Sequence, residues 1–340
     1  MKILRLLLML ILMGPVAQAN ELDWQYSVKK QDSLWSICKR YVADPLCWKK
    51  LATYNQITNP KYIPPGTVIN IPKAWLIISD SSALVIAEEG KVLLGLDGAE
   101  PDQLLEVGDK LQPNDTVVTY DGSAMVEFAD SSRLLLKANT HVRMDMLKYD
   151  DRSGLAQSRI ELIKGRINNL IEKQRSGEAS YQVITPAAVA AVRGTEFRIA
   201  HRSDADGKSV MITELLEGGV EISSDNEALL LKAGQALVVH EGQPFPEPVE
   251  LLPRPTMDLN SAQSVQLPVQ FKWHAMAGAE KYRVSLYLNE SLIWEKSVDS
   301  SAIELTQLPT ENAMLMIRGV DPLGIEGRDR RILLSAPAEQ

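Results

Sequence analysis

The sequence predicts a multidomain, mainly β protein with a small βααβ head, and three observations lead to this prediction. Residues 24–75 combine two short alternating runs with two helical patterns, residues 76–243 hold many short β-prone runs, and residues 259–340 alternate again. Runs at about 8–12-residue spacing with turn residues between them are typical of all-β sandwiches, rolls and barrels. A chain of 340 residues has room for two or three such domains.

The first residues have the pattern of a secretory signal. Lys2 and Arg5 precede a mostly apolar stretch, and Ala17-Gln18-Ala19 is a small-residue cleavage pattern. The apolar stretch is shorter than the ~20 residues of a spanning helix. We therefore expect a cleaved signal peptide over residues 1–19, with an uncleaved anchor as the alternative. No later stretch is apolar enough to span a bilayer, so we expect the mature chain not to be membrane-spanning.

Charge is spread unevenly along the chain. The net charge is -8, yet residues 24–75 hold eight Lys or Arg and two acids, whereas residues 76–340 hold 26 basic and 40 acidic residues. A basic head on an acidic body argues against general nucleic-acid binding, so no nucleic acid partner is expected. It fits a head that meets an anionic partner, or a small solvated domain.

The head is predicted to run strand, helix, helix, strand. Asp32 and Ser33 are N-cap residues for the first helix. Asp44 and Pro45 are expected to open the second helix, and Asn55 to end it. Both helices show one apolar face. The faces are Leu34, Ile37, Cys38 and Tyr41 for the first helix, and Cys47, Trp48 and Leu51 for the second. Trp35 is also expected in the core.

The only two cysteines of the chain, Cys38 and Cys47, both lie in the head. In an exported chain, two nearby cysteines most simply form one disulfide. Closing a loop of about ten residues would stabilise the head by roughly 2.5–3 kcal/mol. A metal site needs more ligands than two cysteines without a nearby histidine. We expect a disulfide, with no metal and no cofactor.

The segments YSVKKQDSLWSICKRY and WKKLATYNQITNPKYIPPGTVINIP together resemble a LysM domain over their whole length. The family's Gly-Asp-Thr-Leu corresponds to residues 31–34, and its Asn-x-Ile, Asn-Pro and Ile-x-Pro-Gly elements to residues 55–57, 59–60 and 63–66. The resemblance implies a peptidoglycan-binding domain over residues 20–75. Such domains bind N-acetylglucosamine-containing glycans in a groove between the loop that opens the first helix and the loop before the second strand.

Carried over to this chain, the implied glycan-binding residues are Asp32, Ser33, Leu34, Asn59, Pro60, Lys61 and Ile63. Helix-start N–H groups and short polar side chains suit acetamido and hydroxyl groups, and Leu34 and Ile63 suit the apolar parts of a sugar. Gln31 stands where the family has a glycine that allows a tight turn. The alternative is therefore a LysM fold that has lost glycan binding and serves as a spacer.

Residues 76–243 carry a second resemblance. The run from Thr185-Pro186 to Val192-Arg193-Gly194-Thr195-Glu196-Phe197, together with residues 108–109, 119–128 and 165–167, resembles a FecR domain. The resemblance implies an all-β, extracytoplasmic, non-enzymatic module for protein contact. In the iron-citrate signalling protein that names the family, this domain relays a transport signal to a sigma factor. That protein has a cytoplasmic anti-sigma segment where this chain has a signal pattern, so the signalling role is not carried over.

Within this signature, Arg193, Gly194, Thr195, Glu196 and Phe197 place polar groups between apolar flanks. Such a set can be a catalytic centre, or a turn whose polar groups satisfy one another. The four histidines are far apart, no serine has a G-x-S-x-G setting, and no phosphate-binding or dinucleotide-binding loop is present. We therefore expect a structural turn, and we expect the protein not to be an enzyme. The histidines are His141, His201, His240 and His274.

Residues 244–258 contain five prolines, which predicts a stiff linker. After it, residues 259–340 show Phe-x-Trp, then Ala-x-x-Tyr-x-Val, then Arg-Gly-Val-Asp, a pattern that resembles a fibronectin type III-like β-sandwich. This resemblance implies a fold and no ligand, because such sandwiches host many unrelated tasks.

Together these expectations describe a non-catalytic cell-envelope protein, periplasmic and associated with the cell wall. Its head would bind peptidoglycan, and its β domains would contact an envelope protein whose identity the sequence does not give. The first alternative is a periplasmic sensor or regulator that acts through the FecR-like domain with a membrane partner. A wall hydrolase is a further alternative, although the sequence offers no nucleophile or acid–base pair for it.

Overall fold

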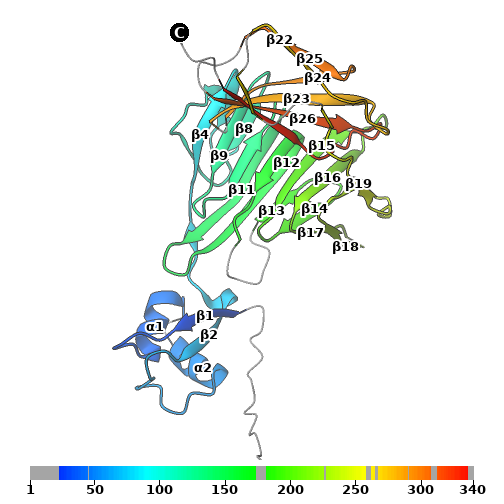
Figure 1. Cartoon of the computed structure of the whole chain (residues 1–340). Helices are drawn as coiled ribbons and strands as arrows, with labels where there is room; N and C mark the ends of the chain where they lie inside the picture. The colour runs from blue at the N-terminus through cyan, green and yellow to red at the C-terminus, as the bar shows by residue number, and fades with distance from the viewer. Residues whose placement is uncertain are drawn as a thin grey trace, which may run out of the picture. The chain divides into compact units, whose positions relative to one another are not determined.

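A computed structural model describes residues 23–44, 46–173, 181–225, 227–257, 262–264, 267–289, 291–307 and 312–335. The expected signal peptide, residues 1–19, lies outside the described residues. The chain divides into two compact units, one that ends at Ile77 and one that begins at Ile78 (Figure 1). The prediction of a multidomain, mainly β protein is confirmed: the described residues hold two α-helices, one 3-10 turn and 27 strands.

The first unit follows the predicted order of elements. It contains β1 (Asp23–Ser27), α1 (Leu34–Tyr41), α2 (Cys47–Tyr54), β2 (Val68–Pro72) and the 3-10 turn η1 (Lys73–Trp75). The two strands pair antiparallel, and both helices bury the predicted apolar faces, apart from the half-buried Trp48. The predicted disulfide between Cys38 and Cys47 is confirmed. Trp35 contradicts the prediction, since 57% of it is exposed to solvent.

The helix ends follow from local hydrogen bonding. Ser33 caps α1: its hydroxyl accepts the N–H of Ser36, and its own N–H donates to the Ser36 hydroxyl. Helix α2 begins two residues later than Asp44-Pro45 predicts, with Leu46 as its N-cap; Pro45 itself lies outside the described residues. Asp44 still accepts the N–H of Leu46 through its carboxylate. Asn55 ends α2, as predicted.

The second unit opens with eighteen short and long strands. They are β3 (Ser79–Asp80), β4 (Ala83–Glu89), β5 (Val92–Gly95), β6 (Gln103–Leu104), β7 (Lys110–Leu111), β8 (Thr116–Thr119), β9 (Ser123–Glu127), β10 (Arg133–Leu136), β11 (His141–Asp150), β12 (Leu155–Leu170), β13 (Tyr181–Ile184), β14 (Val189–Val192), β15 (Glu196–Ser203), β16 (Ser209–Glu217), β17 (Gly219–Ser223), β18 (Ala228–Lys232), β19 (Gln235–His240) and β20 (Val249–Glu250).

These strands form two sheets joined in one closed array. The first sheet runs β6-β5-β8-β11-β12-β13-β14-β17-β18, with β3 beside β11. The second runs β7-β4-β9-β10-β12-β15-β16-β19-β20. Strand β12 belongs to both. It leaves the first sheet after Lys164 and enters the second at Gly165, whose φ is +99°. A Cβ there would overlap Thr140, so this bend requires glycine.

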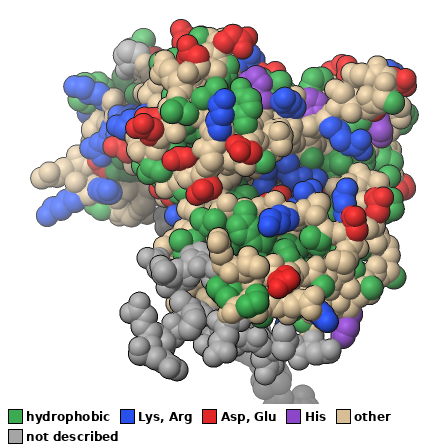
Figure 2. Space-filling view, turned by 90° about the horizontal axis from the view of Figure 1, so that it is seen from above, with side chains coloured by type: hydrophobic (Ala, Val, Ile, Leu, Met, Phe, Trp, Pro, Cys, Tyr) green, Lys and Arg blue, Asp and Glu red, His purple; other side chains and the backbone are tan. Residues whose placement is uncertain are grey.

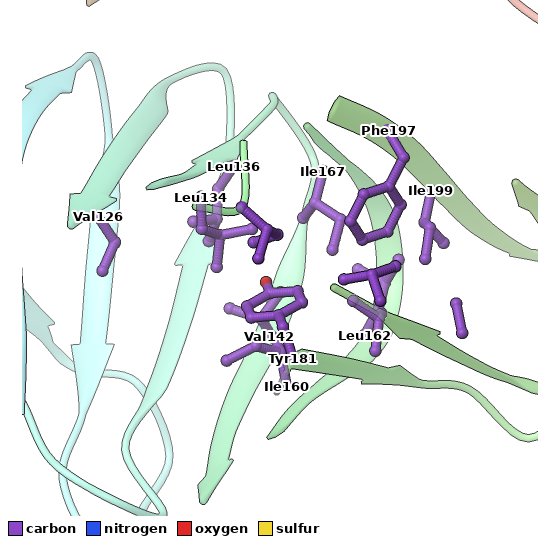
Figure 3. Packing of buried hydrophobic residues seen from close by; sticks show 14 of the residues in the cluster. Val126, Leu134, Leu136, Val142, Ile160, Leu162, Ile167, Tyr181, Phe197 and Ile199 are labelled. Atoms are coloured by element: carbon purple, nitrogen blue, oxygen red, sulfur yellow. The ribbon is translucent and has the colours of Figure 1, made fainter. Parts of the chain in front are cut away.

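One hydrophobic core fills the space between the two sheets. Figure 3 shows Ile160, Leu162 and Ile167 of β12 close to the rings of Tyr181 and Phe197. The two rings meet edge to face, with their centroids 6.3 Å apart. The Tyr181 hydroxyl donates to Oδ1 of Asn169 over 2.8 Å, which satisfies its polar end inside the core. Burial accordingly raises the pKa of Tyr181 well above its usual value.

The C-terminal residues of the second unit form two further sheets. Five strands follow the order β21-β27-β26-β23-β24, and β22 pairs with β25. Their buried residues share one core around Phe271, Trp273 and Tyr282. The fibronectin type III-like topology stays a prediction. The strands are β21 (Ala262–Ser264), β22 (Val269–Lys272), β23 (Lys281–Leu288), β24 (Ser291–Val298), β25 (Ala302–Leu305), β26 (Ala313–Val320) and β27 (Arg330–Ser335).

The C-terminal sheet packs against the outer face of the second FecR-like sheet. Strand β15 shows the alternation: Phe197 and Ile199 join the core between the sheets, whereas Arg198 and Ala200 face the C-terminal part. Two apolar clusters hold this contact. One is Leu135, Tyr287 and Leu292, and the other is Ala200, Ile212, Ala236, Leu251 and Ile325. Leu251 comes from the proline-rich segment expected to be a linker, which also contributes β20 to the sheet.

A buried ion network lies between these two clusters of the same unit. Arg198 of β15 lies 3.2 Å from the carboxylate of Glu214 and 3.4 Å from that of Asp329. Arg318 pairs with Glu326 at 2.7 Å, and the N–H of Glu326 donates to Glu214 over 2.8 Å. All of these side chains are at most 10% exposed. The network therefore ties the FecR-like sheet to the C-terminal strands through groups that water does not screen.

The network continues at both ends. Arg166 of β12 pairs with Glu214 at 2.8 Å and donates to the carbonyl of Gly324 over 3.0 Å. Lys137 pairs with Glu295, which also accepts a hydrogen bond from the hydroxyl of Ser285 over 2.7 Å. On the face shown in Figure 2, basic and acidic side chains are interspersed with small hydrophobic patches.

The pKa values of the buried acids show how the network is balanced. Burial by itself raises the pKa of Glu326. Arg166 and Arg318 lower it by more than burial raises it, so the net pKa lies well below its usual value. The pKa of Asp329 is lowered for the same reason, by Arg318 and then Arg198. Both acids are therefore charged partners at neutral pH, and the guanidinium groups compensate the cost of burying them.

Replacing Arg198 with Met should destabilise the second unit by about 3–5 kcal/mol, because Glu214 and Asp329 would keep buried charges without their shared partner. Arg331→Met is the matched control, since the pair between Arg331 and Glu196 is exposed and should contribute less than about 1 kcal/mol. Urea unfolding of the two variants measures the difference. Equal losses would contradict the proposed weight of the network.

Acid should also weaken this contact. Because the folded pKa values of Glu326 and Asp329 are lowered, their contribution is complete above the unfolded values of about 4 and is lost as pH falls toward the folded ones. The urea concentration at the unfolding midpoint should therefore decrease as the pH is lowered from about 5 to about 3, around the ordinary carboxyl pKa values. In an Asp329→Asn variant the midpoint should decrease less over the same range. A midpoint that stays constant over this range would count against the prediction.

Candidate functional site

Two loops of the head carry the residues implied for glycan binding. The first follows Val28 and leads into α1, and the second runs from Ile57 to Gly66. The N–H of Gly66 donates to the carbonyl of Val28 over 2.8 Å, and the N–H of Val28 donates to Thr67 over 2.9 Å. These two bonds hold the start of the first loop beside the end of the second. The loops therefore leave the β1–β2 ribbon at the same end.

Asp32 holds the first loop together. Its carboxylate accepts a hydrogen bond from the Tyr26 hydroxyl over 2.6 Å and one from the N–H of Lys29 over 2.8 Å. Arg40 lies 3.7 Å away, and the Asp32 side chain is only 6% exposed. Burial raises its pKa, but the hydrogen bonds from Tyr26 and Lys29 lower it more, so the net pKa of Asp32 is lowered. The carboxylate is thus engaged within the fold.

Several other implied residues also turn inward. The side chains of Leu34 and Ile63 are buried in the core, at 0% and 5% exposure, and the hydroxyl of Ser33 caps α1. Pro60 is half-buried. For these residues the groups nearest to a ligand would be backbone atoms, so the apolar sugar contacts expected from Leu34 and Ile63 need other side chains.

The implied and neighbouring residues whose side chains are exposed include Gln31, Asn59, Lys61 and Tyr62. Lys29, Lys30, Thr58, Pro64 and Pro65 of the same loops are exposed as well. Oδ1 of Asn59 accepts the N–H of Lys61 over 3.2 Å, which shapes the second loop and leaves the Lys61 ammonium at the surface. Tyr62 is 70% exposed, and Trp35 at the start of α1 presents a second exposed ring. These two aromatic residues are not among those that the LysM resemblance implies; the concentration of Trp and Tyr in residues 24–75 was the available signal.

Gln31 takes the conformation that glycine normally supplies. Its φ is +74°, in the left-handed region, so the turn is kept although the family's glycine is absent. A non-glycine residue there costs roughly 1–2 kcal/mol of backbone strain. The Asp32 hydrogen bonds follow this residue directly and help to hold the turn. The loop shape is therefore retained in this chain.

The Val-Arg-Gly-Thr-Glu-Phe segment connects β14 of the first sheet to β15 of the second. Gly194 has a φ of +69°, and a Cβ there would lie 2.8 Å from Cα of Lys173. Thr195 is buried, and its carbonyl accepts the N–H of Ile171 over 2.9 Å. Glu196 pairs with Arg331 of β27 at 3.3 Å. Phe197 is fully buried in the core.

This segment therefore closes the space between the two sheets, and its residues are engaged in packing and pairing. Arg193 is exposed.

Among the described residues, no group of three or more His, Cys, Asp or Glu could hold a metal ion. His201 is engaged at both nitrogens, with the carbonyl of Leu162 at 2.7 Å and the hydroxyl of Ser209 at 2.8 Å. The Asp204–Gly207 stretch forms the tight turn between β15 and β16.

Comparison with known families agrees with both resemblances. A family model described as LysM domain matches residues 26–72, and one described as FecR protein matches residues 115–221. The chain carries a LysM domain followed by a FecR domain. The loops described above thus belong to the LysM domain, and the segment from β14 to β15 belongs to the FecR domain. Within the described residues, none of the helices has the length and apolar character needed to cross a membrane.

Individual relatives cover only parts of the chain. An uncharacterized protein of Deinococcus radiodurans is 46% identical over 50 residues, which are 15% of this chain and 20% of that protein. Two solved chains described as anti-sigma factors of Parabacteroides distasonis align at 16% and 17% identity, each over 39% of this chain and with a TM-score of 0.31. This chain covers 56% and 57% of theirs.

A third solved structure is similar to a larger share of the chain. It is the extracellular domain of a protein described as a one component system of B. thetaiotaomicron. It aligns at 9% identity over 63% of this chain and 50% of its own length, with a TM-score of 0.20. This chain thus covers one fifth of the curated relative and just over half of the anti-sigma chains, so no activity of theirs is transferred to it.

Replacing Gly194 with Ala should destabilise the FecR domain by about 2 kcal/mol or more, because the left-handed strain is joined by a clash with the Lys173 backbone. Gly207→Ala is the control. Its φ is +79° but no atom lies within 4 Å of the added Cβ, so only the strain of about 1 kcal/mol remains. Thermal unfolding followed by circular dichroism compares the two. Equal losses would show that the Lys173 contact is unimportant.

Proposed function

We propose that this protein is a non-catalytic cell-envelope protein that binds peptidoglycan through its LysM domain and presents its β domains to other proteins. The observation that carries the proposal is the LysM match over residues 26–72 together with two loops that leave one end of its β-ribbon. LysM and FecR domains are binding and regulatory modules, and this supports the non-enzymatic assignment. An exported, periplasmic location associated with the cell wall belongs to the same proposal.

The proposed glycan contacts combine backbone and side-chain groups of the two loops. The N–H of Leu34 in the first turn of α1 would be offered to the glycan, and Asn59 and Lys61 would offer polar side chains. The rings of Tyr62 and Trp35 would supply the apolar contact that the buried Leu34 and Ile63 cannot. The apolar body of each ring can pack on the apolar face of a sugar, and its O–H or N–H group can form a hydrogen bond with a sugar hydroxyl.

A second candidate function is a sensor or regulator that acts through the FecR domain with a membrane-linked partner. The FecR match over residues 115–221 favours it. Such a role is compatible with glycan binding, because the LysM domain forms a unit of its own. Crosslinking in cells separates the two candidates. A regulator should yield a specific membrane protein, whereas crosslinks to wall material alone would contradict this candidate.

The glycan proposal is tested by retention of the full chain on purified sacculi. The Asn59→Ala/Lys61→Ala variant should bind about tenfold more weakly, since two hydrogen bonds of about 0.5–1.5 kcal/mol each would be lost. The Lys49→Ala/Thr53→Ala variant on α2 removes the same kinds of groups away from the loops, and it should bind like the wild type. Asp32 is unsuitable for this test, because its carboxylate stabilises the loop itself.

Two results would refute the proposal. Complete loss of the disulfide-bonded wild-type protein from the sacculi in the wash would reject the anchoring role. Equal losses in the two variants would show that general charge, and not the two loops, retains the protein.

A further inference from the structure

Two adjoining hollows lie in the second unit, where the FecR-like sheet meets the C-terminal sheet. The first, which we call the apolar hollow, has a volume of about 530 Å³. The second, which we call the arginine hollow, has a volume of about 450 Å³. Each falls within the ~300–1,000 Å³ range typical of small-molecule sites. No residue of the LysM loops lines either hollow, and of the Val-Arg-Gly-Thr-Glu-Phe segment only Glu196 and Phe197 do.

The apolar hollow is built from both sheets. Residues of β9, β10 and β12 form one wall, and residues of β26 and β27 form the facing wall. Three of its residues are methionines that are only partly buried, and methionine adapts its shape to apolar ligands. Leu170 and Leu333 remain 48% and 44% exposed. The apolar residues that define it are Met125, Leu135, Leu170, Met314, Met316 and Leu333.

The arginine hollow has an excess of positive charge. Four arginines and three acids line it. The acids are already compensated: Glu196 pairs with Arg331, Asp329 with Arg318, and Glu217 with Lys173. The other three arginines of the hollow, Arg254, Arg328 and Arg330, form no ion pair with the described residues.

Arg330 adds a second sign of an absent acceptor. Its Nε atom is buried, and it has no hydrogen-bond partner among the described residues. A buried donor without an acceptor costs about 1–3 kcal/mol. An anion in the arginine hollow would meet guanidinium groups of the residues that line it, and such groups suit carboxylate and phosphate oxygens.

The two hollows are direct neighbours, because Glu196, Leu216, Asp329 and Arg331 line both. We propose that together they bind a small amphipathic anion, in which a linear apolar chain ends in a carboxylate or phosphate group. The chain lies among the methionines and leucines between the sheets, and the anionic group lies among Arg254, Arg328 and Arg330. This proposal is independent of glycan binding, which involves the other unit.

Calorimetric titration of the full chain tests the site, with dodecanoate and dodecyl phosphate as probes below their micelle concentrations. Both should bind. Dodecanol, which has no charge, should bind at least tenfold more weakly, and acetate and inorganic phosphate, which have no chain, should give no saturable signal. A preference for dodecanoate or for dodecyl phosphate identifies which anionic group the arginines favour.

Variants locate the two ends of the ligand. Arg330→Gln should weaken dodecanoate about tenfold and leave dodecanol unchanged, whereas Leu170→Glu should weaken both. Arg202→Gln, which removes an exposed arginine near the end of β15, is the matched control and should bind like the wild type. The proposal is overturned by the absence of dodecanoate binding, by equal affinity for dodecanol, or by equal losses in Arg330→Gln and Arg202→Gln.

Discussion

The second unit depends on compensating charges that are buried between two β-sheets. A nine-stranded sheet with apolar residues on one face would normally leave its other face to water. Here the other face of β15 and β16 carries Arg198 and Glu214, and the C-terminal strands cover both. Arg318, Glu326 and Asp329 then supply the opposite charges. Because ions are costly to bury alone, the two parts of this unit need one another.

This constraint explains other features of the unit. The proline-rich segment runs along the contact, where β20 pairs with β19 and Leu251 is buried among residues of both parts. Apolar clusters on either side keep water from the ion network. At the edge of the contact the two sheets no longer touch, and the apolar hollow and the arginine hollow lie between them there. A scaffold that needs buried charge for its contact therefore also presents guanidinium groups at the edge of that contact.

The LysM domain is stabilised by other interactions than a buried ion network. It has a thin core around two short helices, and it adds a disulfide, a capping box on α1 and a buried carboxylate that fixes a loop. These devices hold Asp32, Ser33 and Leu34 inside the fold. As a result, the loops offer a ligand backbone groups and exposed side chains such as those of Gln31, Asn59, Lys61 and Tyr62.

The sequence by itself determined what local patterns control. The helix faces of the head, the disulfide, the end of α2 at Asn55, the β-rich body and the two domain families followed from spacing and motif. It also located the turn at Gly194, because a bend between apolar runs needs a residue without a Cβ.

Only the tertiary structure decided which polar residues are buried. In a single sequence, Arg166, Arg198 and Glu214 are charged residues on alternating strands, a pattern that indicates an exposed face. Arg198 and Glu214 lie opposite each other on the neighbouring strands β15 and β16. The groups that enclose them from the C-terminal part, Glu326 and Asp329, lie more than a hundred residues away, so no local spacing could place those contacts. The same holds for Asp32: its motif predicted a ligand contact, whereas the fold surrounds its carboxylate with Tyr26 and Arg40. Burial and charge compensation depend on long-range packing, which the pattern of neighbours along the chain does not encode.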